Sequence, residues 1–218
     1  ADMDRLIRIA VDGPSGAGKS TIAKALAAKL GIDYIDTGAM YRAIGYKMKL
    51  EGIEDGGDAR FGQVLDDTDI DFADGDIILD GETVNDLIRT PEMSERASRF
   101  SAIPAVRAKL VELQRGMGMK KSVIMDGRDI GTNVLKDAEY KFFLTAAAEE
   151  RAERRYKELK EKGENISFEE VLEDIKQRDY RDMTRELNPL KKADDALEVD
   201  TTGLSIEEVT DRIVKEIR

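Results

Sequence analysis

The residues best suited to chemistry lie near the N-terminus, in the stretch AVDGPSGAGKSTIAKAL that spans residues 10–26. Gly13, Gly18, Lys19 and Ser20 fit the pattern of a glycine, four residues, a second glycine, a lysine and then serine or threonine. Glycines let the main chain approach a polyphosphate closely, so that successive backbone N–H groups face the anion. The lysine reaches the β and γ phosphates, and the serine hydroxyl serves Mg²⁺. The pattern predicts a site for a nucleoside triphosphate and leaves the base open.

The segments on either side support this phosphate loop. LIRIAVD (residues 6–12) is typical of a buried strand. A helix is predicted from Thr21 to Leu30, and its positive N-terminal end adds to the field at the anion. A glycine-rich turn between a strand and a helix is the structural alternative, but the complete pattern with both flanks favours the phosphate loop. We expect the triphosphate to be bound by Gly13, Pro14, Ser15, Gly16, Ala17, Gly18, Lys19, Ser20 and Thr21.

Two further clusters follow predicted strands. DTGAMYR (residues 36–42) places Tyr41 and Arg42 after a tight turn, where they could clamp a second substrate. A core Tyr41 and a surface Arg42 are the structural alternative. MDGRDIGT (residues 125–132) places Asp126 and Arg128 just beyond a buried strand, at the edge where open parallel sheets bind ligands. Asp126 occupies the position of a Walker B acid, able to hold Mg²⁺ or its water, and Arg128 can neutralise phosphate.

Two more clusters are predicted on helices. RASRFSAIPAVRAKL (residues 96–110) carries Ser98 and Arg107 on either side of a proline that breaks the helix. KQRDYRDMTRELNPL (residues 176–190) carries four charged residues at three- and four-residue spacing, which predicts one helix face. Those four residues are Arg178, Arg181, Asp182 and Arg185. Mutual ion pairing is the structural alternative, but three arginines for one aspartate leave positive charge for a phosphate.

Composition limits the possible functions. The 218 residues contain no cysteine, which excludes disulfides and thiolate metal sites, and no histidine, the usual general base at neutral pH. Phosphoryl transfer tolerates that absence, because it depends mainly on positioning and charge neutralisation. The formal net charge of −11 argues against broad binding to nucleic acid or membrane. With no long apolar run and no signal-peptide layout, we expect a cytoplasmic protein.

Apolar segments alternate with amphipathic ones, which predicts an α/β fold with a parallel sheet. Strands are predicted at residues 6–12, 32–38, 122–127, 140–146 and 196–202, and further helices at residues 39–52 and from Ser205. DIDFADGDIILDGETVND (residues 69–86) predicts a small antiparallel unit with a turn at Asp80 and Gly81. From Glu149 to Arg185 the chain is charged and helical, with a break at Lys162–Ser167, typical of a solvated hairpin or of a mobile lid.

Taken together, five motifs resemble those of the bacterial cytidylate kinases: GPSGAGKST, DTGAMYR, MDGRDIGT, FFLTAAAEERAERR and RDYRDMTRELNPL. The resemblance covers nearly the whole chain, including the closing LEVDTTGLSIEEV. It implies a three-layer P-loop kinase with a parallel sheet, a small inserted antiparallel β region and a helical lid. It also implies transfer of the γ-phosphoryl group of ATP to CMP or dCMP. Two positions depart mildly from the family pattern: some members have serine in place of Thr37, and a small apolar residue is more usual in place of Asn133.

The resemblance also implies roles for individual residues. The catalytic residues would be Lys19, Arg128, Arg155 and Arg178. The CMP site would contain Thr37, Tyr41, Arg42, Ser98, Arg107, Asp129, Arg178, Asp182 and Arg185. Ser20 and Asp126 would hold Mg²⁺. Cytosine has an amino donor beside two acceptors, so a carboxylate such as Asp129 together with an arginine would select it over uracil.

We predict a core at residues 1–36, 108–148 and 186–218, a monophosphate-binding region at residues 37–107 and a lid at residues 149–185. The expected partners are ATP and CMP or dCMP, with no nucleic acid and no membrane, and the expected state is a monomer. Another nucleoside-monophosphate or small-metabolite kinase is one alternative, which a substrate panel distinguishes. A nucleotide-binding switch with slow hydrolysis is another, although a switch has no need of a second arginine-rich pocket.

Overall fold

The computed structural model describes residues 5–73 and 75–217. These residues form two units, which we describe separately. The first holds the described residues of Ala1–Tyr34 and Lys121–Arg218, and the second those of Ile35–Lys120. In the described part of the chain no helix has the length and apolar character needed to cross a membrane.

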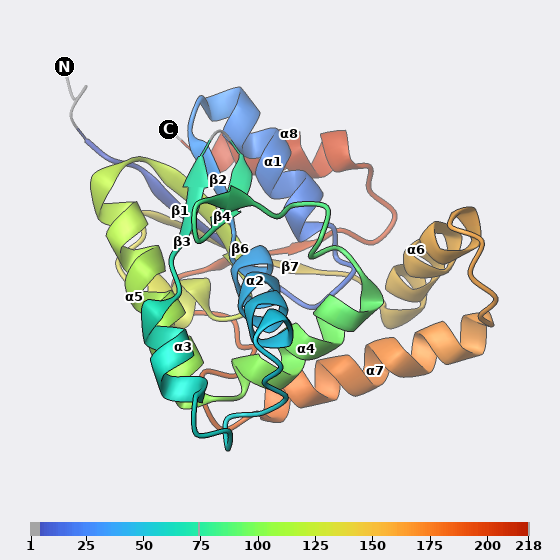
Figure 1. Ribbon diagram of the computed structural model, residues 1–218. Coiled ribbons are helices and arrows are strands. Elements are labelled where there is room, and N and C mark those ends of the chain that lie inside the picture. The colour runs from blue at the N-terminus through green and yellow to red at the C-terminus, as the bar shows by residue number, and fades with distance from the viewer. Residues whose placement is uncertain (1–4, 74, 218) are drawn as a thin grey trace. The chain divides into compact units, whose positions relative to one another are not determined.

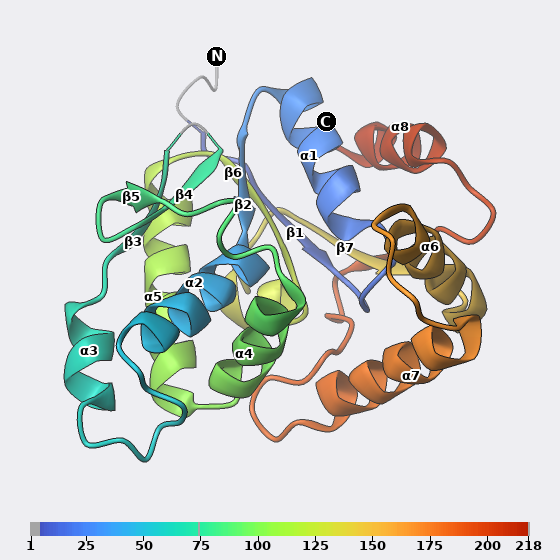
Figure 2. The same ribbon diagram turned by 45° about the vertical axis from the view of Figure 1, so that its right-hand side comes forward.

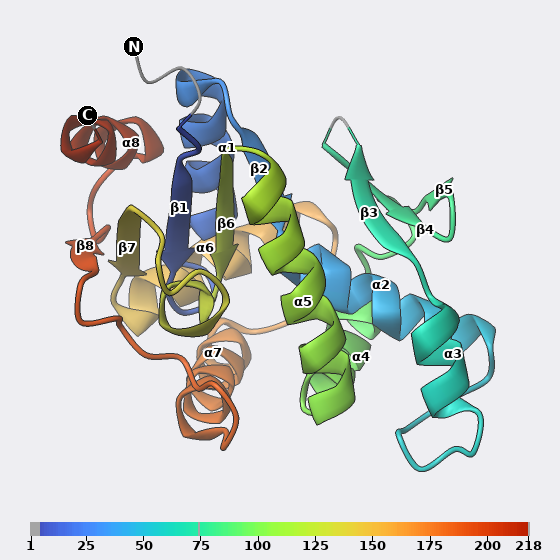
Figure 3. The same cartoon turned by 90° about the vertical axis from the view of Figure 1, so that its left-hand side faces the viewer.

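A five-stranded sheet with the order β2-β6-β1-β7-β8 organises the first unit. The strands are β1 (Arg8–Asp12), β2 (Asp33–Asp36), β6 (Val123–Gly127), β7 (Tyr140–Thr145) and β8 (Leu197–Asp200). β1 pairs in parallel with both β6 and β7, and Figure 3 shows these three strands side by side. Asp12 at the end of β1 lies opposite Gly127 and Phe143, so the carboxyl ends of the three strands meet at one edge. The five strands that the sequence predicts are confirmed.

Helices α1 (Lys19–Leu30) and α8 (Ile206–Glu216) pack against this sheet and share one apolar core with it (Figure 2). Ser205 and Glu208 form a capping box, which fixes the start of α8 where the sequence predicts it. α1 starts at Lys19, two residues before the predicted Thr21, because the Ile22 N–H already bonds to the Gly18 carbonyl at 2.9 Å. Lys19 and Ser20 therefore belong to the first helical turn.

Helices α6 (Ala148–Glu161) and α7 (Phe168–Thr184) lie side by side in Figures 1 and 2. Ala152, Val171 and Ile175 form their small apolar core, and the predicted break between the helices is confirmed. Ser167 caps α7 by accepting a hydrogen bond from the Glu170 N–H. The prediction that Arg185 shares the helix face of Arg178 is wrong, since the helix ends at Thr184 and Arg185 is extended.

The second unit combines four helices with a small antiparallel sheet of order β3-β4-β5, seen in Figure 3. Its elements are α2 (Thr37–Leu50), α3 (Phe61–Asp67), β3 (Ile70–Ala73), β4 (Asp76–Leu79), β5 (Glu82–Thr83), α4 (Pro91–Ser101) and α5 (Pro104–Lys120). Asp80 and Gly81 have φ values of 50° and 85°, as the predicted two-residue hairpin turn requires. Pro104 starts α5, which confirms the predicted helix break.

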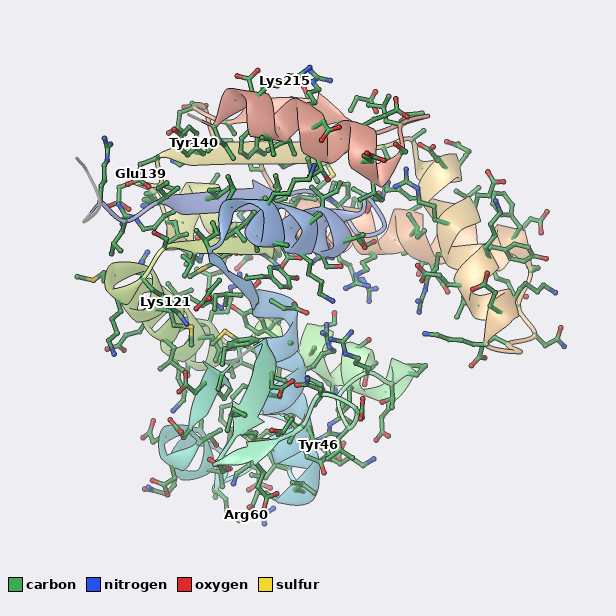
Figure 4. The ribbon with its side chains drawn as sticks, turned by 90° about the horizontal axis from the view of Figure 1, so that it is seen from above. Tyr46, Arg60, Lys121, Glu139, Tyr140 and Lys215 are labelled. Atoms are coloured by element: carbon green, nitrogen blue, oxygen red, sulfur yellow. The ribbon has the colours of Figure 1, made fainter. Side chains whose placement is uncertain are left out.

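Cationic side chains hold α2 in place within the second unit. Arg60, labelled in Figure 4, donates to the Glu51 carbonyl at 3.0 Å, just past the C-terminal end of α2. Arg96 is buried and donates to the Gly45 carbonyl at 2.9 Å and to the Ile53 carbonyl at 2.8 Å. These bonds tie Arg60 and Arg96 to the backbone of α2 and of the segment that follows it. They fix the helix on which Tyr41 and Arg42 stand.

Candidate active site

The predicted phosphate loop connects β1 to α1 in the first unit. Gly13 lies so close to the backbone of Leu144 that a Cβ atom would collide with the Leu144 carbonyl oxygen. Gly18 precedes the helix in the left-handed conformation with φ 83°. Side chains are therefore excluded at both ends of the loop, which leaves its backbone N–H groups accessible to an anion.

Lys19 is buried, with 8% of its surface exposed, and its Nζ donates to the Pro14 carbonyl at 3.0 Å. Burial and the nearby Arg128 lower the pKa of Lys19 to about 7, although Asp126 opposes the shift. An anion bound to the loop would favour the charged ammonium. Ser20 is exposed in the first turn of α1, where its hydroxyl can face a ligand of the loop.

Two carboxylates stand at the strand ends beside the loop. Asp126 on β6 is buried and accepts a hydrogen bond from the Tyr34 hydroxyl at 3.0 Å. Asp12 on β1 is 4% exposed and accepts bonds from the Ile130 and Gly131 N–H groups, each at 2.8 Å. Burial raises the pKa of Asp12 to about 6, although these two backbone bonds act in the opposite direction. Asp12 therefore joins the start of the phosphate loop to the segment that follows β6.

That segment contains a π-helix, η1 (Ile130–Val134), which the sequence did not predict. Single π-helical turns occur often at functional sites. Asp129 precedes η1, is buried, and accepts a bond from Asn133 Nδ2 at 3.2 Å. Arg185 Nη2 lies 3.9 Å from the Asp129 carboxylate, while Arg185 Nε donates to the Asn188 carbonyl at 2.8 Å. The structure thus brings together Asp129, Arg185 and Asn133, the residue that departs from the family pattern.

Arginines gather at the same edge of the sheet. Arg128 Nε donates to the Asp182 carboxylate at 2.6 Å, which links the end of β6 to α7. Repulsion from Arg128 lowers the pKa of Arg178 to about 10, although Asp182 opposes this. The Arg178 guanidinium group therefore remains charged at neutral pH. Arg155 on α6 is half exposed and pairs with Glu158 at 3.3 Å. The cluster therefore holds more positive charge than its aspartate balances.

The remaining predicted residues lie in the second unit. Thr37 is buried at the start of α2, and Arg42 on the same helix lies 3.3 Å from the Asp36 carboxylate. Arg107 on α5 is buried, and its guanidinium carbon lies 5.5 Å from the centre of the Tyr41 ring. Ser98 is exposed on α4. The contact between Tyr41 and Arg107 joins two residues that the sequence selected independently.

Sequence reasoning missed several residues beside the phosphate loop. Their contacts come from residues distant in the chain, so no local pattern reveals those contacts. Asp12 had a usable signal, an acidic residue directly before the first glycine of the motif, and Arg151, Arg154 and Asp179 lie within the quoted motifs FFLTAAAEERAERR and RDYRDMTRELNPL. The missed residues are Asp12, Tyr34, Arg151, Arg154 and Asp179.

Comparison with known proteins gives one consistent answer. The family model described as cytidylate kinase matches residues 9–218. The chain belongs to the cytidylate kinase family. It is 57% identical to a cytidylate kinase of Clostridioides difficile (strain 630) over 209 residues, which cover 96% of this chain and 97% of that one. It is 54% identical to a cytidylate kinase of Caldicellulosiruptor saccharolyticus over 213 residues, which cover 96% and 94% of the two chains.

Solved structures support the fold of this cytidylate kinase family member. An uncharacterized protein from Eubacterium ventriosum matches with a TM-score of 0.55 and 17% identity, over 98% of each chain. A shikimate kinase from Acinetobacter baumannii in complex with shikimate matches with a TM-score of 0.50 and 16% identity, over 99% of this chain and 95% of that one. At such low identity these likenesses concern the fold alone. The predicted three-layer α/β P-loop kinase fold is confirmed.

Proposed function

We propose that this chain transfers the γ-phosphoryl group of ATP to CMP or dCMP, giving ADP and CDP or dCDP. Membership in the cytidylate kinase family supports the reaction. One observation at the site supports the proposal. An arginine cluster with excess positive charge lies in the same unit as the phosphate loop. A protein that only binds and hydrolyses a triphosphate needs no second cationic site for an acceptor phosphate.

ATP would bind through the loop from Gly13 to Thr21. The buried hydroxyl of Ser15 has no hydrogen-bond partner within residues 5–73 and 75–217, and a phosphate oxygen would supply one. Lys19 would bind the β and γ phosphates, and the positive end of α1 would add to its field. These groups neutralise charge on the triphosphate before and during transfer.

Arg128, Arg155 and Arg178 would stabilise the group being transferred. In phosphoryl transfer the charge spreads over the equatorial oxygens, and fixed cations lower the barrier without any proton transfer of their own. Because Asp182 already pairs with Arg128, that arginine is oriented before substrate binds. The arrangement suits a chain without histidine, since the acceptor phosphate is itself an anion.

Mg²⁺ fits the oxygen donors at the strand ends. Magnesium uses one or two carboxylates together with substrate phosphates and water, rather than a complete protein cage. Asp126 and the Ser20 hydroxyl supply such donors, and no group of three acidic side chains that could hold a metal occurs within the described ranges. When bound, the ion would be held by Asp126 and Ser20 and would neutralise charge on the phosphates.

CMP recognition is assigned to residues of each unit. In the first unit, Asp129 would accept from the cytosine amino group, with Arg178, Asp182 and Arg185 serving the rest of the nucleotide. In the second unit, buried Nε of Arg42 has no hydrogen-bond partner among the described residues, which suits a phosphate ligand. The second-unit residues proposed for CMP are Thr37, Tyr41, Arg42, Ser98 and Arg107. We also retain the predicted monophosphate region at residues 37–107 and the predicted lid at residues 149–185.

A coupled assay that follows ADP tests the proposed reaction. With ATP and Mg²⁺ present, CMP and dCMP should each produce rapid ADP release, whereas AMP and GMP should not. ADP release at the same rate without any acceptor would contradict the proposal and favour a hydrolysing switch. We further propose a monomer in the cytoplasm; light scattering should give one chain mass of 24.3 kDa.

A further inference from the structure

Three consecutive carbonyl groups of the phosphate loop each accept a hydrogen bond from a cationic side chain. Lys19 Nζ donates to the Pro14 carbonyl at 3.0 Å. Arg151 Nη1 donates to the Ser15 carbonyl at 3.1 Å, and Arg154 Nη1 donates to the Gly16 carbonyl at 3.2 Å. The loop therefore directs its acceptors toward positive charge, and two of the three cations come from α6.

The orientation of these carbonyls also fixes the loop's donors. A trans peptide group is planar, so its N–H points opposite to its C=O. The described chain contains no cis peptide bond, so this rule applies to the loop. Holding the Ser15 carbonyl toward Arg151 turns the Gly16 N–H away from Arg151. In the same way, Arg154 sets the direction of the Ala17 N–H. Both N–H groups belong to the segment proposed to bind the triphosphate.

Arg151 is itself held rigidly. It is 5% exposed, its Nε donates to the Ala146 carbonyl at 3.0 Å, and its two Nη atoms bind the Asp179 carboxylate at 3.0 and 2.7 Å. Such a two-pronged contact fixes the plane of the guanidinium group as well as its position. Asp179 stands on α7, so both helices of the pair contribute to the orientation of one peptide group in the phosphate loop.

We propose that Arg151, Arg154 and Asp179 are positioning residues that preset the N–H donors of the phosphate loop for the triphosphate. Arg151 and Arg154 act on the loop directly, and Asp179 acts through Arg151. The inference rests on the proposed function for its substrate, ATP. It makes nucleotide affinity depend on the packing of α6 and α7, beyond any contact that those helices make with the nucleotide.

The alternative is that the Arg151–Asp179 ion pair only stabilises the helix pair. The two roles differ in their kinetic consequences. A structural defect lowers the folded fraction, which lowers kcat and leaves the KM for ATP unchanged. Misdirected loop donors weaken binding of the triphosphate in molecules that are fully folded, so the KM for ATP rises.

The experiment compares Asp179→Asn, Arg151→Lys, Arg154→Gln and the double variant Arg151→Lys/Asp179→Asn with the wild type. Asp174→Asn is the matched control, because Asp174 is an exposed aspartate on the same helix. The measurements are the KM for ATP at saturating CMP, the affinity for a non-hydrolysable ATP analogue by calorimetry, and the folded fraction by circular dichroism. The calorimetric arm needs no turnover and reports on binding alone.

Asp179→Asn and Arg151→Lys should each weaken ATP binding about tenfold, the usual scale for losing a charge-assisted bond. Arg154→Gln should weaken it less, because Arg154 is partly exposed. The double variant should bind ATP no more weakly than the weaker-binding of the two single variants, since both changes disrupt the same contact. Asp174→Asn should match the wild type.

An unchanged KM and analogue affinity in Asp179→Asn and Arg151→Lys would overturn the inference, as would losses that multiply in the double variant. If the Arg151–Asp179 ion pair proves necessary for folding, Arg154→Gln still tests the proposal. An unchanged affinity of Arg154→Gln for the ATP analogue would contradict it. Failure of the proposed function gives a different result. In that case the wild type would bind the ATP analogue but would not phosphorylate CMP, and the effects of the variants on analogue affinity would still be measurable.

Discussion

Lys19 combines burial with two neighbouring arginines, which makes its environment unfavourable for its own charge until an anion arrives. Lys19→Ala should therefore lower kcat at least a hundredfold, which corresponds to about 3 kcal/mol of transition-state stabilisation. No other residue from Gly13 to Thr21 is cationic. The variant should remain folded, as judged by circular dichroism. Lys24→Ala, which removes an exposed lysine from the same helix, is the control and should retain wild-type turnover.

Asp12 should make stability fall as the pH rises from 4 to 6. The folded protein keeps the Asp12 proton up to a pKa of about 6, whereas the unfolded chain releases it near the ordinary aspartate pKa of 3.8. Between these values the unfolded state binds fewer protons, so the free energy of unfolding decreases with pH by about 3 kcal/mol in total. Other carboxylates titrate as well, and Asp12→Asn removes only this contribution.

The measurement is therefore a difference. Urea unfolding at several pH values gives the free energy of unfolding of the wild type and of Asp12→Asn. Between pH 4 and pH 6.5 this free energy should fall more for the wild type than for Asp12→Asn as the pH rises. Parallel pH dependences would show that burial of Asp12 does not affect its titration.

Asp129 should distinguish cytosine from uracil. Asp129→Ala should reduce kcat/KM for CMP by about 2 to 3 kcal/mol and reduce that for UMP much less, because the proposed bond to the cytosine amino group would be charge-assisted. The alternative is a structural role for Asp129, which also contacts Asn133 and lies near Arg185. If Asp129 only holds these neighbours, both monophosphates should suffer equally. The KM for ATP in the same preparation is the internal control.

Among the elements, α2 and α4 pack closely because position 45 carries no side chain. A Cβ atom at Gly45 would lie 2.9 Å from Arg96 Cβ, so the helices would have to separate. Gly45→Ala should destabilise the protein by about 1 to 3 kcal/mol. Gly116→Ala is the matched control, because Gly116 also lies within a helix but has nothing within 4 Å of an added Cβ. It should be neutral or stabilising by up to about 1 kcal/mol, by helix propensity alone. Thermal unfolding of both variants checks the pair.

The sequence predicted those elements whose signals are local. The phosphate-loop pattern, the Asp80–Gly81 turn and the helix start at Ser205 each depend on residues close in the chain, and the structure contains the turn and the helix start as expected. The π-helix η1 is different, because its geometry depends on Asp12, which lies 118 residues away from Ile130 in the chain.

The arginines of the candidate site also differ in whether local sequence signals mark them. Arg178 and Arg128 lie in motifs with a recognisable order, so the family resemblance selected them. Arg151 lies four residues before the selected Arg155 in the same motif, but the motif alone does not show what Arg151 contacts. Its partners Ser15 and Asp179 are 136 and 28 residues away. Helical periodicity also predicted Arg185 on the same helix as Arg178, but α7 ends at Thr184.

For the molecule as a whole, the absence of histidine shapes the expected pH dependence. The rise of kcat/KM with pH should follow the second ionisation of the acceptor phosphate, near about 6. An acceptor analogue with a lower phosphate pKa should shift the curve to lower pH by the same amount. Asp12 has a pKa in this region, so the comparison should be repeated in Asp12→Asn. A curve that stays in place with the analogue and moves in the variant would assign the ionisation to the enzyme.

The order of strands in the parallel sheet has a consequence for synthesis of the chain. Among the five strands β1 is synthesised first, yet it is the central strand, and both of its neighbours come much later, at Val123 and Tyr140. Ile9, Ala10 and Val11 are fully buried in the finished sheet, so the nascent chain must carry them without a pairing partner until β6 and β7 have been made. An unpaired apolar strand is a template for aggregation. A truncated product that ends before β6 would contain the whole phosphate-loop motif and neither of the strands that flank β1.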